Sequence, residues 1–155
     1  MRGKQKNLRE ISPDSKYNNH LIAKFINYIM KGGKKSVAEK IVYQAFDIIK
    51  EKTGENPVEV FDGAVKNVSP MLEVRGRRIG GANYQIPYPV RGNRKYALAF
   101  RWIINAAEQR KGIPMSKKLA LELIDAYNKE GASIKKREDV HRMAEANRAF
   151  AHFAR

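Results

Sequence analysis

Apolar side chains recur every three to four residues along most of the chain, which is the spacing of one face of an α-helix. Glycine or proline residues delimit six such stripes. The first, for example, runs from Leu21 to Met30 and stops at Gly32-Gly33. Together the stripes predict about six helices, over residues 21–30, 36–53, 57–69, 96–107, 116–130 and 134–150.

Capping residues support the expected starts of these helices. Ser36 and Asn56 are each followed three positions later by a glutamate, as in a capping box, and Pro57 suits a first helical turn. Ser116 and Ser133 are the expected starts of the last two helices.

Residues 71–91 have a different pattern, in which side chains alternate about the pair Gly80-Gly81. Two adjacent glycines accept the positive φ of a tight turn, so the segment predicts a β-hairpin. Alternation places Arg75 and Arg77 on one face. Prolines in the return strand cannot donate ladder hydrogen bonds, which indicates an edge strand. A lone two-stranded arm is marginally stable, so we expect it to need a partner surface.

The expected fold is therefore mainly α: a helical bundle with one extended β-hairpin between the third and fourth helices. Short connections favour a compact bundle, and 155 residues favour a single domain, 1–155. Within it, residues 1–16 are expected to be a flexible basic arm and residues 71–91 a hairpin arm.

Charge adds a partner to this picture. The chain has 31 Lys and Arg against 16 Asp and Glu, a formal net charge of +15. This excess favours a polyanion, with nucleic acid first and an anionic membrane surface second. The chain lacks cysteine, which excludes disulfides and thiolate metal sites. With no apolar run long enough for a bilayer and no secretory signal, we expect a cytoplasmic protein or a mature plastid product.

The cations gather in four places. Between residues 71 and 101 there are seven cations and one acid, Glu73. Arginine can donate two parallel hydrogen bonds to a phosphate and can also stack on bases, which suits structured RNA. The candidate RNA-binding residues are Arg2, Lys4, Lys6 and Arg9 in the arm, Lys34 and Lys35, Arg75, Arg77, Arg78, Arg94 and Arg101, and Lys135, Lys136, Arg137 and Arg142.

Some of these clusters can also be explained without an RNA partner. For the arm the alternative is a solubilising tail. Lys34 and Lys35 follow a helix C-terminus, where cations are favoured in any case. They also precede a helix N-terminus, which favours phosphate. Cations at the start of the last helix oppose its macrodipole, so an anionic partner explains them better. Tyr84 and Tyr88 can stack on bases or pack internally, and packing is favoured for Tyr88.

Enzyme and metal chemistry have little support. His141 and Glu145 stand four residues apart, but two ligands do not make a zinc site. No Gly-Lys-Ser/Thr follows the hairpin glycines, and no serine stands in a nucleophile elbow. We expect no enzyme activity, no metal and no cofactor.

Taken in order, these segments resemble ribosomal protein seven of the small subunit, in its bacterial or plastid form. The resemblance covers nearly the whole chain. Its motifs include Pro13-Asp14-Ser15-Lys16-Tyr17, Gly33-Lys34-Lys35-Ser36, Arg77-Arg78-Ile79-Gly80-Gly81, Tyr84-Gln85-Ile86-Pro87, Arg101-Trp102-Ile103 and Lys135-Lys136-Arg137-Glu138-Asp139.

The resemblance implies a protein that binds the 3′ major (head) domain of small-subunit ribosomal RNA early and nucleates head assembly. It also implies a place at the subunit interface near the exit-site tRNA and the mRNA path. The tip residues expected near tRNA are Gly80, Gly81, Asn83 and Tyr84. The implied neighbours are ribosomal proteins nine, eleven, thirteen and nineteen of the small subunit.

Two other classes remain open from the residues alone. Basic β-arms also enter DNA grooves, so a DNA-architectural protein is one alternative. An enzyme acting on RNA is the other, although the sequence supplies no acid–base pair at a recognisable spacing.

Overall fold

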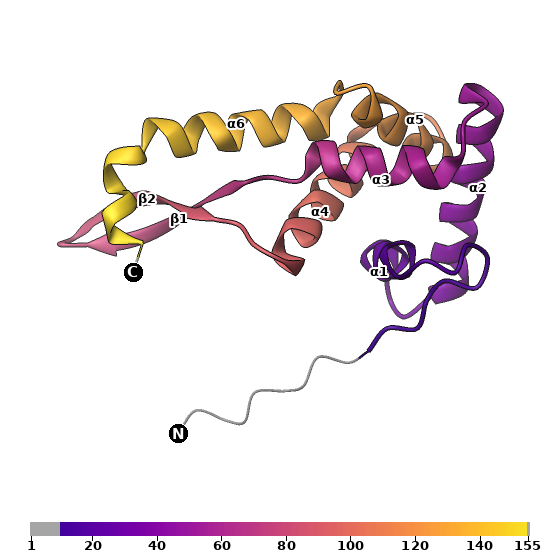
Figure 1. Ribbon diagram of the computed structural model, residues 1–155, viewed down its shortest axis with the longest axis horizontal. Helices are drawn as coiled ribbons and strands as arrows, with labels where there is room; N and C mark the ends of the chain where they lie inside the picture. Colours follow the sequence, from indigo (N-terminus) through magenta and orange to yellow (C-terminus); the bar gives the residue numbers. More distant parts are fainter. Residues whose placement is uncertain (1–9, 155) are drawn as a thin grey trace.

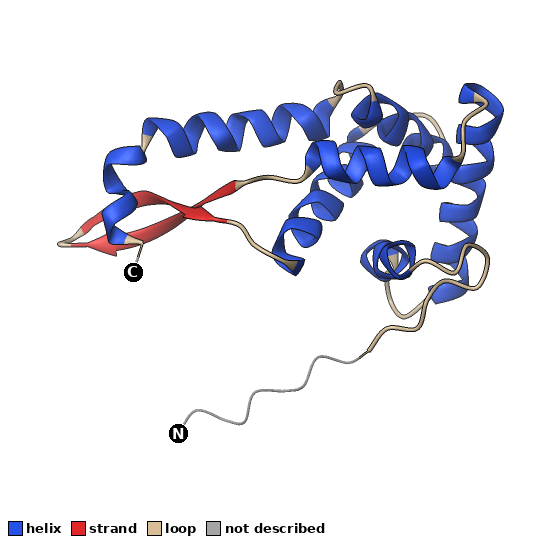
Figure 2. Cartoon of the chain, in the orientation of Figure 1, coloured by secondary structure: helices blue, strands red, loops and turns tan. Residues whose placement is uncertain are grey.

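The computed structural model describes residues 10–154. Two antiparallel strands stand in the middle of an otherwise helical chain (Figures 1 and 2). In order, the elements are α1 (His20–Ile29), α2 (Lys35–Thr53), α3 (Pro57–Val68), β1 (Leu72–Ile79), β2 (Ala82–Pro89), α4 (Asn93–Gln109), α5 (Met115–Tyr127), α6 (Ala132–Ala146) and the 3-10 helix η1 (Arg148–Phe153). The predicted fold class, with the hairpin between the third and fourth helices, is confirmed.

Four phenylalanines form the centre of the helical body, one from each of the first four helices. The ring of Phe25 lies 5.1 Å from that of Phe61 and 5.1 Å from that of Phe100, while Phe46 lies 5.6 Å from Phe61. All four side chains are fully buried. Helix α5 contacts α2, α3 and α4, so it closes the core around this aromatic cluster.

The starts of the helices follow the sequence in one case and depart from it in three. Asn56 caps α3 by accepting from the Val58 N–H at 3.1 Å, as predicted. The predicted cap at Ser36 is wrong, because α2 already begins at Lys35 and has no side-chain cap. Helix α5 begins one residue before Ser116, behind the extended Pro114.

The third departure concerns Ser133, which lies inside the first turn of α6 rather than before it. Gly131 takes the N-cap position with a φ of 92°, a conformation that favours glycine. The buried Ser133 hydroxyl instead donates to Glu122 of α5 at 2.7 Å. The Ser133 hydroxyl, which the sequence predicted as a helix cap, therefore makes a contact between α5 and α6 instead.

The hairpin has the predicted two-residue turn. Ile79 pairs with Ala82, and the φ values of Gly80 and Gly81 are 57° and 91°. Because residues directly opposite share a face, the register places Arg77 beside Tyr84. The pairs Glu73 with Tyr88 and Arg75 with Ile86 lie on the same face.

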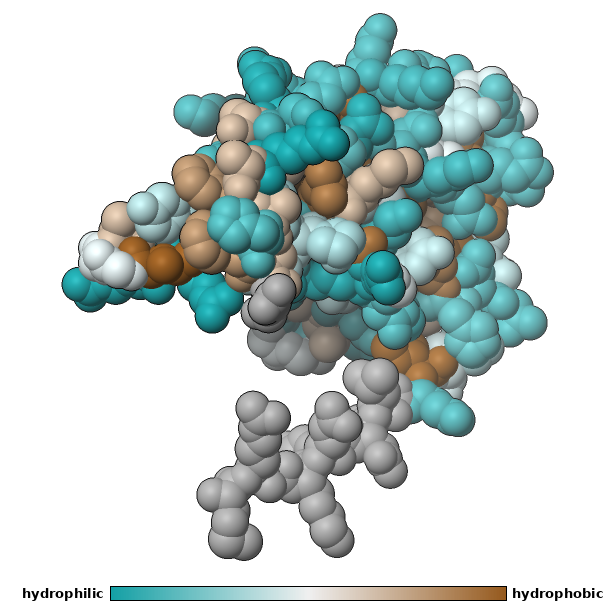
Figure 3. Space-filling model, turned by 60° about the vertical axis from the view of Figure 1, so that its left-hand side comes forward, coloured by the Kyte–Doolittle hydropathy of each residue, from teal (hydrophilic) through white to brown (hydrophobic). Residues whose placement is uncertain are grey.

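The chain itself supplies part of the cover that we expected from a partner. Helix α6 runs beside the hairpin and η1 folds over it (Figure 1). The Tyr84 ring lies 5.0 Å from the ring of Phe150 and 6.3 Å from that of Phe153. Apolar surface on the protruding arm lies beside strongly hydrophilic surface (Figure 3). The arm is thus a layer of hairpin, α6 and η1 rather than two strands alone.

Asp14, within the predicted N-terminal arm, is held against the helical body. Its carboxylate accepts from the Lys16 and Tyr17 N–H groups at 3.1 and 3.0 Å, and the Tyr43 hydroxyl donates to it at 2.5 Å. Burial first, and this carboxylate second, raise the pKa of Tyr43. The chain is therefore anchored on α2 before α1 begins.

None of the helices in residues 10–154 combines the length and the apolar character needed to cross a bilayer.

Candidate nucleic-acid interface

Glu73 links the hairpin to α4. Its side chain is only 8% exposed, and its two carboxylate oxygens accept from different arginines. Arg75 donates to one oxygen, and Arg94 donates to the other at 3.0 Å. The Arg75 and Arg94 side chains remain 56% and 44% exposed. One buried acid thus fixes two exposed cations side by side across two elements.

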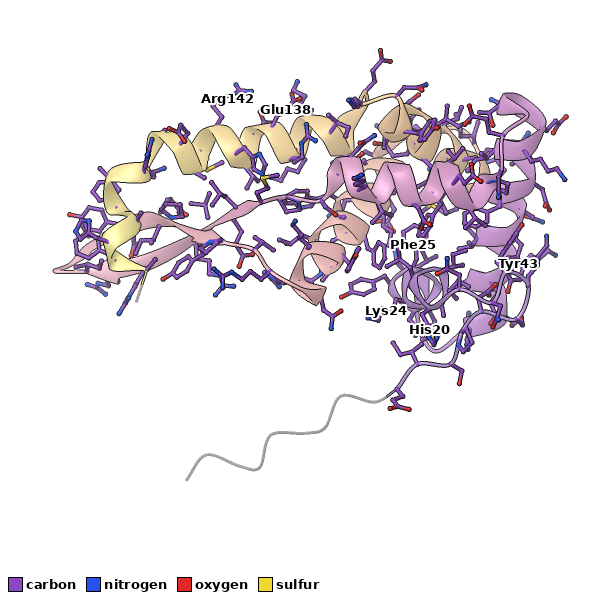
Figure 4. All side chains as sticks on the ribbon, in the orientation of Figure 1. His20, Lys24, Phe25, Tyr43, Glu138 and Arg142 are labelled. Atoms are coloured by element: carbon purple, nitrogen blue, oxygen red, sulfur yellow. The ribbon has the colours of Figure 1, made fainter. Side chains whose placement is uncertain are left out.

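Helix α4 extends this line of charge toward α1. Arg101 lies seven residues after Arg94, so the two project from the same face of the helix. The Arg101 guanidinium lies 6.0 Å from the centre of the Tyr28 ring on α1. Also from α1, the Lys24 ammonium donates to Asn93 at 3.2 Å. Figure 4 shows Lys24 on α1 together with Phe25.

We call Lys24, Arg75, Arg94 and Arg101 the α4 basic surface. Arg75, Arg94 and Arg101 are exposed, and Lys24 is half-buried. Its arginines can donate paired hydrogen bonds to phosphate oxygens, which suits a nucleic-acid backbone. The carboxylate beside it, Glu73, is already paired with two arginines and so does not repel an anionic partner strongly.

The hairpin tip divides into an open part and a packed part. Gly80, Gly81 and Asn83 are exposed, as is Arg78. Tyr84 is half-buried against the aromatic rings of η1, so its packing is internal. The Arg77 guanidinium donates to the Phe153 carbonyl at 2.9 Å. Tyr88, which we expected in the core, is half-buried and lies under the Arg75 guanidinium at 5.1 Å.

Lys34 and Lys35 are exposed where the turn after α1 meets the start of α2. Lys34 occupies the N-cap position of α2, and Lys35 forms a loose ion pair with Glu39 at 3.8 Å. In the same turn, Lys31 pairs with Glu108 of α4 at 2.6 Å. Because Glu108 lies seven residues after Arg101, this lysine cluster continues the same face of α4.

The four cations predicted along α6 do not form one site. Lys135 and Lys136 are exposed and line a cavity between α4 and α6. Arg137 donates to the Asn67 carbonyl in the last turn of α3, so it also ties two helices together. Arg142 pairs with Asp139 at 3.1 Å and points away from the hairpin, beside Glu138 (Figure 4). The arm residues Arg2, Lys4, Lys6 and Arg9 lie outside the described residues.

His141 has a structural contact rather than a free ligand position. Its Nε2 accepts from the Met71 N–H at 3.1 Å, which joins α6 to the start of the hairpin. Burial first, and the nearby Arg137 second, lower the pKa of His141, which favours the neutral ring that this bond requires. Within residues 10–154, no group of three or more His, Asp or Glu side chains is placed to hold a metal ion.

Sequence reasoning missed the role of Glu73 and the presence of Lys24 in this interface. The count of acids singled out Glu73, but its role depends on a contact with Arg94, 21 positions away. Lys24 carries no signal in the sequence, because Asn93 lies 69 positions from it. The spacing of seven between Arg94 and Arg101 was the one local clue to a shared face.

Known proteins resemble this chain over nearly its whole length. The model of the family described as ribosomal protein S7p/S5e matches residues 1–148. The chain belongs to this family. It is 59% identical over 145 residues to the small ribosomal subunit protein uS7 of Desulfatibacillum aliphaticivorans, covering 94% of this chain and 93% of the relative. It is 58% identical over 153 residues to the protein of that name from Thermotoga maritima, covering 99% of each.

Proposed function

We propose that this protein is a structural component of the small ribosomal subunit that binds the 3′ major domain of its RNA and nucleates assembly of the head. Its family and the names of its relatives support the ribosomal setting. The observation that carries RNA binding is the α4 basic surface, where Glu73 holds Arg75 and Arg94 in fixed positions.

A fixed set of arginines favours folded RNA over diffuse polyanion binding. A guanidinium that is already oriented loses less conformational freedom when it binds phosphate. The net charge of +15 adds long-range attraction, which speeds encounter with any nucleic acid. The α4 basic surface therefore favours the phosphate backbone of folded RNA over other polyanions, while the overall charge adds affinity for any of them.

The hairpin tip is the part that we assign to the neighbourhood of the exit-site tRNA and the mRNA path. Gly80, Gly81 and Asn83 are exposed there, and Arg78 supplies a cation beside them. Tyr84 contributes by holding the tip onto η1, because its ring packs on Phe150. Contacts with ribosomal proteins nine, eleven, thirteen and nineteen belong to the same proposal.

Binding to a transcript of the head domain at several salt concentrations tests the proposal. The test variant is Lys24→Gln with Arg101→Gln, since neither residue holds the buried Glu73. The matched control is Lys50→Gln with Lys52→Gln, two exposed cations in the last turn of α2. Each lost phosphate contact should lower the salt slope by roughly one.

We expect the test variant to bind roughly tenfold more weakly, with a smaller salt slope, and the control to change little. Equal losses in the two variants would mean that binding depends on net charge alone. Preference for duplex DNA of equal length in a competition assay would instead support a DNA-architectural protein and contradict the proposal.

A further inference from the structure

A cavity of about 510 Å³ lies between α4 and α6, apart from the α4 basic surface. Pockets for small organic molecules commonly have volumes of roughly 300–1,000 Å³, so this one is large enough for a nucleotide. One wall is a second face of α4. The other is the first two turns of α6. Its lining includes Trp102, Asn105, Gln109, Lys135 and Lys136.

Most polar side chains that line this cavity have no hydrogen-bonding partner in the described part of the chain. In residues 10–154, the side chains of Asn105, Gln109, Lys135 and Lys136 make no hydrogen bond or ion pair, and the indole of Trp102 stacks on no other ring. Asp139, the one acid in the lining, is paired with Arg142. Two lysines in the first two turns of α6 also oppose its macrodipole, so folding alone does not explain them.

These groups match the parts of one nucleotide. An indole offers a stacking surface for a base, and side-chain amides both donate to and accept from a base edge. Ammonium groups bind phosphate. The aromatic and amide groups come from α4, and the cations come from α6. A ligand that has a base at one end and a phosphate at the other can therefore bridge the two helices.

We propose that this cavity binds one unpaired nucleotide of the RNA that the protein recognises. Its base lies against Trp102 and meets Asn105 and Gln109, while its phosphate lies by Lys135 and Lys136. The proposal rests on the RNA-binding function above and adds a site of base recognition to a backbone contact. Single-stranded loops and bulges supply such nucleotides, because their bases are free to leave the stack.

Trp102 is the only tryptophan of the chain, so its emission reports on this cavity alone. Wild-type protein is titrated with a head-domain RNA transcript while emission and acrylamide quenching are measured. At saturation we expect emission to fall by half or more and acrylamide to reach the indole less. The variant Asn105→Ala with Gln109→Ala removes the hydrogen bonds to the base edge but leaves the indole, and it should weaken binding roughly fivefold, the effect of losing about one net hydrogen bond.

The lysines have a matched control. Lys135→Gln with Lys136→Gln should weaken binding roughly tenfold. Lys117→Gln with Lys118→Gln makes the same change of charge in the first turn of α5, outside the cavity, and should cost much less. All four positions are at or near the surface of helices, so the variants should fold, and circular dichroism checks that they do.

The outcomes separate this site from the general function. If wild-type protein binds the transcript but Trp102 keeps its emission and its access to acrylamide, the cavity site is wrong and the proposed function stands. Equal losses in the two lysine pairs would also contradict the site. If only the complete subunit protects Trp102, a neighbouring protein fills the cavity instead. If the transcript does not bind at all, both proposals fail.

Discussion

Replacing the carboxylate of Glu73 should weaken RNA binding even though it makes the protein more positive. The variant Glu73→Gln keeps the shape of the side chain but removes the charge that Arg75 and Arg94 share. Both arginine side chains are about half exposed, so solvent screens each ion pair. Two pairs of roughly 0.5–1 kcal/mol each give a loss of stability of about 1–2 kcal/mol.

Two effects on RNA affinity then oppose each other. Losing one acid adds attraction of roughly 1 kcal/mol or less, because two arginines already neutralise most of the charge of Glu73 and water screens the RNA phosphates from it. Releasing two arginines costs roughly 0.5–1.5 kcal/mol for each side chain that the RNA must order again. The second effect is larger, so we expect binding to weaken by about three- to tenfold.

Urea unfolding measures the loss of stability, and filter binding to the head-domain transcript measures affinity. Glu51→Gln is the matched control, because it removes an exposed acid of α2 that has no ion pair in the described residues. It should leave stability unchanged and raise affinity slightly. If Glu73→Gln raises affinity as the control does, fixed arginines are not what the RNA recognises.

Three further predictions concern the framework. Glu122→Ala should lower the free energy of unfolding by about 3 kcal/mol in urea, because Glu122 is fully buried and Arg110 loses its main partner. A loss below about 1 kcal/mol would contradict the importance of this buried ion pair. Folding lowers the pKa of His141, so the unfolded chain binds this proton more readily than the folded protein does. Stability should therefore fall as pH drops below about 6.5, the ordinary pKa of histidine. The variant His141→Gln should flatten that part of the pH profile. A Cβ at Gly63 would lie 2.6 Å from the Tyr127 ring, so Gly63→Ala should lower the stability of the wild type. In the variant Tyr127→Ala, which lacks the ring, the same Gly63→Ala change should instead raise stability by about 1 kcal/mol. If Gly63→Ala changes stability in the same direction in both backgrounds, the clash is refuted.

The sequence predicted those features that depend on local physics. Helical stripes and the Gly80-Gly81 turn depend on near neighbours, so the elements and their order were readable. The expected caps Ser36, Ser116 and Ser133 each lie at the second position of their helix, because α2, α5 and α6 begin at Lys35, Met115 and Ala132. At Ser133 a tertiary competitor replaces the local cap. For Ser133 that competitor is the buried Glu122 of α5, which takes both its N–H and its hydroxyl.

The sequence predicted which cations are candidates for the site, but not how they are arranged in space. Arg75 and Arg94 were singled out, yet nothing local says that Glu73 holds both. Arg137 has the same sequence signal as Lys135, but it also donates to the Asn67 carbonyl, 70 positions away. The cavity beside Trp102 exists only because α6 packs along α4. Side-chain type and spacing predict chemistry, whereas long-range packing decides which groups act together.

Nucleotide-resolution footprinting of the protein on intact small-subunit ribosomal RNA tests the central claim most directly. Backbone cleavage is compared with no protein, with wild-type protein and with the variant Lys24→Gln, Arg101→Gln. The account predicts protection confined to the 3′ major domain, and the loss in the variant of a subset of those protected nucleotides. Protection spread over the other domains, or a footprint that the variant leaves unchanged, would contradict it.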